Sequence, residues 1–333
     1  MAATKSENTV DLFAEARSAQ IKDQLGRPAS GTVKVVAPAK VNLFLGIGPR
    51  RADGYHDAVN IMHAVNLHDV LYMQVKEGLG EEQGLTVQVR TSAREGLAPL
   101  DVPPQDNLVY RAIMRLAERL GRTQRETIEV HLEKHIPAQA GLGGGSSDAA
   151  AALVGAARLW DVPGDHPALE EVARSLGSDV AFFLHGGCAC FGGAGELFEQ
   201  ALAPMKKQLV LIKPDEGVST AAAYRAFDEC PQLVDAALEQ TARQAAQAQE
   251  VPLFNNLAPA AERLLPLLAD VRVWTCAQPG VEDVLLCGSG STTFAVCVDF
   301  DAACRLSASA RQRGWWARTT AFGSVKAAVM SRG

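Results

Sequence analysis

The chain has 333 residues, 47% of them hydrophobic and 21% charged, which is the composition of a globular protein. Its formal net charge of −6, with no block of like charges, argues against a nucleic-acid-binding surface, although an anion can still bind in a local pocket. No apolar run is long enough to span a bilayer, and the opening residues lack the apolar region of a secretory signal.

The polar segment at residues 1–31 mixes both signs of charge, and we expect it to be an appended, mobile extension. Regular structure is expected from residue 32, because Val33 and Val35 before Pro38, and a valine and two leucines at 41, 43 and 45 after it, give the period of a strand. The same patterns predict further strands at residues 69–75, 85–90, 128–136, 188–193, 208–214, 283–290 and 292–298. Helical periodicity predicts helices at residues 107–121, 146–160, 166–177, 219–230, 252–269 and 300–314.

The order of these elements favours an α+β fold, because strands and helices mix without the regular alternation of a doubly wound sheet. A chain of this length exceeds what one hydrophobic core usually supports, so two domains are expected. A glycine-rich stretch followed by a strand indicates a join near residues 195–206. We therefore predict one domain at residues 32–200 and a second at residues 206–333.

The seven cysteines contain no C-x-x-C pair of the kind found in metal and redox sites. Cys188, Cys190, Cys287 and Cys297 lie in apolar, strand-like surroundings. We interpret them as small buried hydrophobic residues rather than disulfide partners or metal ligands. Free cysteines of this kind indicate a reducing compartment, and we predict a cytoplasmic protein.

The most unusual stretch is "PAQAGLGGGSSDAA" at residues 137–150, which has four glycines between Gly141 and Gly145. Glycine is entropically costly to order, so such a cluster is expected where something approaches the backbone closely. The alanine-rich run that follows predicts a helix, and its first N–H groups and dipole would favour an anion, most often a phosphate. Ser146, Ser147 and Asp148 are suited to capping this helix or to binding a metal ion.

Several known phosphate-binding loops do not fit this glycine stretch. A Walker loop needs a lysine after its glycines, and none follows here. The dinucleotide fingerprint needs a third glycine where Ser146 stands. Protein-kinase signatures such as H-R-D and D-F-G are absent from the sequence. A flexible turn before an ordinary helix remains the simplest alternative.

Five segments in order resemble the GHMP kinases, a family that includes galactokinase, homoserine kinase and mevalonate kinase. "PAKVNLFL" (38–45), "IPAQAGLGGGSSDAA" (136–150) and "LCGSGSTTFAV" (286–296) resemble the three motifs of this family. "RADGYH" (51–56) and "LGSDVAFFLHGG" (176–187) resemble one member in particular, which phosphorylates a cytidine-diphosphate-linked methylerythritol in the non-mevalonate (MEP) isoprenoid pathway. The resemblance runs from about residue 33 to the end of the chain.

The resemblance implies a two-domain α+β GHMP-kinase-like fold with the active site in the cleft between the domains. It implies transfer of the γ-phosphoryl group of ATP to the 2-hydroxyl of CDP-methylerythritol, with ATP and Mg²⁺ required. The expected partners are these small molecules, with no nucleic acid or membrane, and either a monomer or a homodimer fits. Two alternatives stay open, namely a mevalonate- or homoserine-type kinase and a catalytically inactive nucleotide-binding homologue.

The catalytic residues implied by the resemblance are Lys40 and Asp179. By its position in an alternating strand, Lys40 points either into a site or to solvent. The family places a catalytic lysine there, whose ammonium would stabilise negative charge on the attacking hydroxyl. Asp179 is by itself an ordinary turn or capping residue, and the family makes it the general base that accepts the substrate proton.

Lys134 ends the strand-like segment at 128–136, on the face that should point along the buried side toward the glycines. Its ammonium would contact a nucleotide phosphate or extend to solvent. His131 and His135 fall on the opposite face, and we interpret them as exposed rather than as zinc ligands, because "HLEKH" has the period of a strand. The residues assigned to ATP are Lys134, Pro137, Ala138, Gln139, Ala140, Gly141, Leu142, Gly143, Gly144, Gly145, Ser146 and Ser147. Ser147 is also the candidate Mg²⁺ ligand.

The resemblance assigns the segment ending in Tyr55 and His56 to the cytidine end of the substrate. His56 is able to hydrogen-bond a base edge and to stack, and Tyr55 offers a second aromatic face. Asn42 would orient the substrate near Lys40. The residues assigned to the substrate are Asn42, Tyr55, His56, Tyr224, Gly288 and Gly290, with Phe227 as the alternative to Tyr224 against cytosine. Relatives more often have proline where Ser291 stands, so the family pattern does not predict the geometry of this turn.

Overall fold

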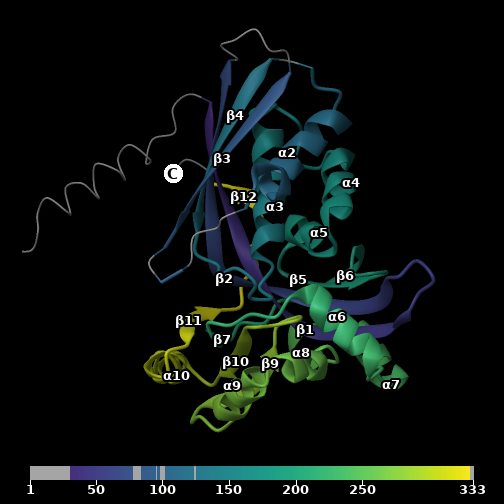
Figure 1. Ribbon diagram of the computed structural model, residues 1–333, viewed down its shortest axis with the longest axis vertical. Coiled ribbons are helices and arrows are strands. Elements are labelled where there is room, and N and C mark those ends of the chain that lie inside the picture. Colours follow the sequence, from purple (N-terminus) through teal and green to yellow (C-terminus); the bar gives the residue numbers. More distant parts are fainter. Residues whose placement is uncertain (1–30, 78–83, 95, 98–101, 124, 331–333) are drawn as a thin grey trace, which may run out of the picture.

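The computed structural model describes residues 31–77, 84–94, 96–97, 102–123 and 125–330, in which two sheets and their helices form an α+β protein, as predicted (Figure 1). Apart from Gly31, the predicted N-terminal extension lies outside these residues. No helix in the described ranges is long and apolar enough to cross a membrane.

The first sheet has eight strands, and its longest two, β1 (Thr32–Arg50) and β2 (His56–Glu77), form an antiparallel hairpin. Their register shifts between Pro38 and Ala39, a position at which proline has no N–H to donate to a neighbouring strand. The main strand order is β12-β1-β2-β4-β3, and β3 is parallel to β4. The remaining strands are β3 (Leu85–Ala93), β4 (Glu126–Lys134), β5 (Cys188–Gly192), β6 (Leu197–Leu202), β8 (Phe254–Asn255) and β12 (Ala328–Val329).

Four helices cover one face of this sheet (Figure 1). They are α2 (Leu108–Arg119), α3 (Gly144–Leu159), α4 (Pro167–Leu176) and α5 (Ser178–His185), and the short helix η1 (Pro104–Asp106) precedes α2. Most of α3 is buried, because alanine and glycine let its backbone approach β1 and β2 closely. The sequence analysis missed α5, whose residues Val180–Phe183 are all buried and so show no amphipathic period.

The second sheet is antiparallel, with the order β11-β7-β10-β9. Its strands are β7 (Gln208–Lys213), β9 (Val281–Leu286), β10 (Thr293–Cys297) and β11 (Trp316–Ala321). The helices that follow β6 in the chain are α6 (Thr220–Glu229), α7 (Ala236–Gln244), η2 (Ala248–Glu250), α8 (Ala258–Leu264), α9 (Leu267–Cys276) and α10 (Phe300–Gln312). The sequence analysis missed β6, α7, β11 and β12 because they are short or weakly periodic.

The single helix predicted at residues 252–269 was wrong. Phe254 and Asn255 form strand β8, and Pro266 separates α8 from α9. The Asn255 and Asn256 side chains bond to backbone groups elsewhere, which favours an irregular chain path over a helix at this point. Because β8 pairs with β1 and β12 pairs with β1, the chain after residue 206 returns twice to the first sheet. We retain the division at residues 200–206 as a proposed domain boundary.

All seven cysteines are free, and the four that were predicted to be buried are buried. Desolvation raises the pKa of Cys188 and of Cys190 to about 12, and of Cys297 to about 11. These thiols therefore stay protonated at neutral pH, as expected of small core residues.

His63, on β2, connects the first sheet to the chain after β6 as a neutral, fully buried imidazole. Its Nδ1 lies 2.8 Å from the Ala64 carbonyl oxygen and so carries the hydrogen, while Nε2 accepts from the Met205 N–H at 2.9 Å. The ring centroid of Phe322, after β11, lies 4.6 Å from that of His63. Burial lowers the pKa of His63 from 6.5 to about 4, because a charged ring would lose its solvation and its bond to Met205.

A pH-dependent stability is the expected consequence. Because the pKa of His63 is lower in the folded than in the unfolded chain, its contribution is complete above pH 6.5 and is lost as pH falls toward 4. The loss by pH 5 should be about 2 kcal/mol. Urea unfolding at pH 7.5 and pH 5 measures it. His63→Gln retains an acceptor for Met205 but does not titrate, so the wild type should lose about 2 kcal/mol more than this variant. Equal losses would contradict the prediction.

Candidate active site

A cleft of about 600 Å³ lies where the glycine stretch meets β1, β2, α5, α6 and the loop between β9 and β10. The polar and glycine residues that line it come from distant parts of the sequence. They include Lys40, Asn42, Asn60, Lys134, Gln139, Gly141, Gly143, Gly144, Gly145, Ser146, Asp148, Ser178, Asp179, Thr220, Tyr224, Gly288 and Ser289, together with Pro137, Ala138, Ala140 and Leu142. The fold thus gathers most of the sequence-predicted site residues around one cavity.

Lys40 and Asp179 meet in this cleft. The Lys40 Nζ lies 3.3 Å from Asp179 Oδ2, and the two side chains are 4% and 25% exposed. The ammonium also donates to Asn42 Oδ1 at 2.8 Å, and Asn42 Nδ2 donates to Asn60 Oδ1 at 2.7 Å. Lys40 therefore points into the site rather than to solvent, and Asp179 lines the cleft beside it.

Two glycines of the loop are required by contacts with other parts of the protein. Gly141 has φ +73°, and a Cβ there would overlap the Cys287 carbonyl oxygen. Gly143 has φ +70° and ends the loop as the N-cap of α3, where a Cβ would lie 2.7 Å from the Phe183 ring. Both backbones thus adopt a conformation that favours glycine and pack against protein atoms. The sequence predicted that something approaches the glycine backbone closely, and at these two glycines it is other parts of the protein that do so.

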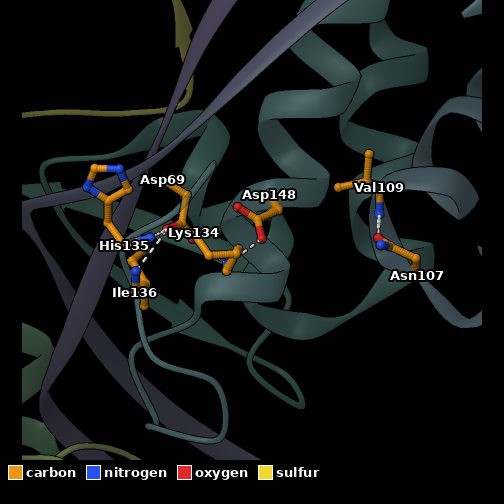
Figure 2. Close-up of polar contacts among 7 residues, drawn as sticks. All are labelled: Asp69, Asn107, Val109, Lys134, His135, Ile136 and Asp148. Atoms are coloured by element: carbon orange, nitrogen blue, oxygen red, sulfur yellow. Dashed lines mark hydrogen bonds and ion pairs between the residues drawn. The ribbon is translucent and has the colours of Figure 1, made fainter. Parts of the chain in front are cut away.

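Beneath the loop, Lys134 is held between two buried carboxylates (Figure 2). Its Nζ pairs with Asp69 and lies 2.6 Å from Asp148 Oδ2, on α3. Asp69 also accepts the N–H groups of His135 and Ile136, at the entry to the glycine loop. The Lys134 side chain is only 8% exposed, so it does not extend to solvent. These contacts join β2, β4 and α3 and fix the base of the loop.

Burial and the neighbouring charges shift the pKa values of both Asp148 and Lys134. Burial raises the pKa of Asp148 to about 8, while Lys134 opposes the shift and Asp69 adds to it. The two carboxylates raise the pKa of Lys134 against the effect of burial, so the ammonium stays charged.

The sequence-predicted exposure of His131 and His135 is only partly met, since both are half-buried. Separately, Asn107 caps α2 by accepting from the Val109 N–H (Figure 2).

A second cavity of about 800 Å³ adjoins the cleft, and Ser178, Ala194 and Tyr224 line both. Tyr55 and His56 line the second cavity, with Tyr55 66% exposed and His56 buried. The Tyr224 ring centroid lies 5.7 Å from that of His56. Burial raises the pKa of Tyr224 to about 12, with a further contribution from the charge of Asp179. Tyr224 therefore stands, as a neutral phenol, at the junction of the two cavities.

Phe227, the alternative to Tyr224, faces neither cavity. It is almost fully buried and packs edge-on against His56, with ring centroids 5.9 Å apart. Of the two aromatic rings on α6, Tyr224 is the one that a ligand would meet.

The loop between β9 and β10 closes the cleft from the second sheet. Gly288 lines the cleft and Gly290 does not; a Cβ built on Gly290 would point toward Leu268 and Leu286. The Gly290–Ser291 peptide is cis. Asn255 donates to the Leu286 and Gly288 carbonyls, both at 2.8 Å, and so holds this loop against the first sheet. Ser147 is fully buried, between Ser146 and Asp148, which both line the cleft.

Several residues of the site were missed by the sequence analysis. Asn60, Asp69 and Asn255 position cleft residues, and Asp228 contacts His56. Each is a polar residue within or beside an apolar segment, as in "VNIM" around Asn60. That signal marks a buried polar group but does not identify its partner.

Known proteins resemble this chain over most of its length. Residues 107–187 match the N-terminal domain of the GHMP kinases. A 4-diphosphocytidyl-2-C-methyl-D-erythritol kinase of Desulfitobacterium hafniense (strain Y51) is 38% identical over 300 residues, covering 88% of this chain and 98% of that protein. A protein of the same name from Thermobifida fusca (strain YX) is 36% identical, covering 92% of this chain and 100% of that protein.

Solved structures give the same picture. A crystal structure of a 4-(cytidine 5'-diphospho)-2C-methyl-D-erythritol kinase has a TM-score of 0.69 and 35% identity, covering 87% of this chain and 100% of that one. A homoserine kinase from Cytophaga hutchinsonii has a TM-score of 0.66 at 18% identity, covering 91% of this chain and 99% of that one. This second likeness is one of fold.

Proposed function

The chain belongs to the 4-diphosphocytidyl-2-C-methyl-D-erythritol kinases of the GHMP kinase family, and from this premise we propose how its residues carry out the reaction. The protein transfers the γ-phosphoryl group of ATP to the 2-hydroxyl of CDP-methylerythritol, a step of the non-mevalonate isoprenoid pathway. The single observation that carries the proposed roles is the meeting of Lys40 and Asp179 at 3.3 Å in the cleft beside the glycine loop.

Asp179 acts as the general base. Its carboxylate accepts the proton of the 2-hydroxyl, whose oxygen then bonds to the γ-phosphorus as the bond from that phosphorus to the ADP oxygen breaks. The Lys40 ammonium stabilises the negative charge that develops on the attacking oxygen, and Asn42 and Asn60 hold the ammonium in place.

The glycine loop holds the phosphates of ATP. The first N–H groups of α3 have no partner within the helix, and its dipole favours negative charge at this end. Lys134 lines the cleft below the loop, and its ion pairs with Asp69 and Asp148 keep the loop in shape. Phosphoryl transfer depends mainly on such positioning and charge neutralisation.

Mg²⁺ fits the residues at the start of α3. Among the described residues, Ser147 Oγ and Asp148 Oδ1 are buried oxygens without a hydrogen-bond partner. Magnesium prefers oxygen ligands and commonly takes only one or two from the protein, with the rest from phosphates and water. We therefore propose that Ser147 and Asp148 hold the ion, which when bound would neutralise phosphate charge.

The free cysteines support a reducing, cytoplasmic setting.

Turnover by the purified protein tests this function. ADP release should require both ATP and CDP-methylerythritol, and the product should carry one additional phosphate. Mevalonate and homoserine, assayed side by side, should give no release above background. Release with either of them instead would identify a sibling kinase, and ATP binding without any product would identify an inactive homologue.

A further inference from the structure

A third cavity, of about 470 Å³, lies between Leu67 of the first sheet and β11, the edge strand of the second sheet. Among the described residues, none that lines it also lines the active-site cleft or the second cavity, so the proposed reaction leaves it unused. Cavities of this size suit small molecules rather than single ions. The side chains that determine its chemistry are Arg94, His135, Asp215, Arg311, Trp316 and Arg318.

The third cavity concentrates positive charge. Three arginines line it against one aspartate, in a chain whose net charge is −6. Within the described ranges, neither Arg94 nor Arg318 has an ion pair or a side-chain hydrogen bond. Guanidinium groups gathered with only one carboxylate repel one another and attract anions. The lining therefore favours an anionic ligand.

Arg311 is held in place by the protein itself. Its Nε and Nη2 donate to the Ala317 carbonyl oxygen, at 3.0 and 2.9 Å. A guanidinium has five N–H donors, so three remain for a ligand. The planar fork of an arginine matches pairs of oxygens on a phosphate, and these charge-assisted bonds are strong. Three arginines suit a phosphate group, whose charge approaches −2 at neutral pH, better than a single carboxylate.

His135 adds a donor without charge. Burial lowers the pKa of its imidazole from 6.5, and the charge of Arg94 adds to this effect while Asp69 opposes it. The ring is therefore neutral at pH 7.5, and one of its nitrogens carries a hydrogen that a phosphate oxygen is able to accept. The backbone N–H of His135 donates to Asp69, which fixes this residue at the edge of the cavity.

The remaining side chains indicate that the ligand has an organic part. Trp316 is half-buried and lines the cavity, and an aromatic face of this kind binds apolar or planar groups. The Asp215 carboxylate accepts hydrogen bonds and repels a phosphate, so the organic group rather than the phosphate suits its side of the cavity. A phosphate ion alone would leave the Trp316 face unused.

We propose that the third cavity is a second ligand site, separate from the catalytic cleft, that binds a small organic phosphate. Arg94, Arg311 and Arg318 bind the phosphate group, and Trp316 packs against the organic group. The ligand takes no part in phosphoryl transfer, so the inference does not depend on the proposed function.

Phenyl phosphate is the probe, because it joins a phosphate to an aromatic ring and is not a nucleotide. Titration calorimetry at pH 7.5 should give a dissociation constant of about 1 mM or below. Arg94→Gln and Arg318→Gln should each weaken binding at least about fivefold, since each removes a charge-assisted contact. Arg305→Gln is the matched control, because this exposed arginine of α10 lies outside the cavity, and it should bind as the wild type does.

Two further ligands test the two halves of the proposal. Inorganic phosphate lacks the ring and phenol lacks the anion, so each should bind at least about fivefold more weakly than phenyl phosphate. Equal binding of either would overturn the proposed organic phosphate. Absence of saturation by about 10 mM phenyl phosphate, or unchanged binding in both arginine variants, would overturn the site itself.

A measurement on the wild type alone guards against variants that fail to fold. Raising the salt concentration from about 50 mM to about 500 mM should weaken binding of phenyl phosphate several-fold, because salt screens the arginines. Binding that is insensitive to salt would contradict a site that depends on their charge.

Discussion

Replacing Asp179 by asparagine is expected to lower kcat by about a thousandfold while changing the affinity for ATP by less than about threefold. The amide has nearly the shape of the carboxylate but cannot accept the substrate proton. It also removes the negative charge 3.3 Å from the Lys40 ammonium, which leaves that cation without its ion-pair partner in the cleft. ATP is held by the glycine loop, so its binding depends little on this side chain.

Steady-state ADP release gives kcat for the Asp179 variant, and calorimetry gives the dissociation constant of ATP. Asp165→Asn is the matched control, because this exposed aspartate lies in the turn before α4 and outside both cavities. The control should keep wild-type kcat. Retention of more than about a tenth of kcat by Asp179→Asn would exclude a general-base role, since such roles contribute 10²–10⁴-fold.

Replacing Gly141 by alanine is expected to lower kcat/KM for ATP by at least about a hundredfold, a loss of about 3 kcal/mol in transition-state stabilisation. The residue has φ +73°, which costs any L side chain energy, and the added Cβ would overlap the Cys287 carbonyl oxygen. Gly290 O would lie 3.0 Å away. Both obstacles are backbone atoms, so the glycine loop and the β9–β10 loop must separate.

The two loops are otherwise joined by backbone hydrogen bonds. The Thr292 N–H donates to the Ala140 carbonyl at 3.2 Å, and the Ser291 N–H donates to the Gln139 carbonyl at 3.4 Å. Gly164→Ala is the control, because its Cβ would meet nothing within 4 Å. Circular dichroism and thermal melting separate loss of the site from loss of the fold. A folded Gly141→Ala variant with wild-type kcat/KM would contradict the contact between the loops.

Many elements of this protein were predictable from the sequence alone, because a local pattern of residues determines local secondary structure. The period of two predicted β1 and β4, the alanine run predicted α3, and the clustered glycines predicted a tight turn at its start. The family resemblance then predicted that Lys40, Asp179 and the glycine loop belong to one site. Elements without a local signal were missed, such as the uniformly buried α5, and the apolar run at residues 252–269 was taken for one helix.

Only the tertiary structure decided which groups meet. Gly141 is required by a carbonyl from a loop about 150 residues further along the chain, a contact that no local pattern records. The same holds for Lys134, which is held by Asp69 and Asp148, and for Asp228 against His56. A sequence shows that a buried polar residue needs a partner, because an unpaired one is costly, but long-range packing determines which partner it finds.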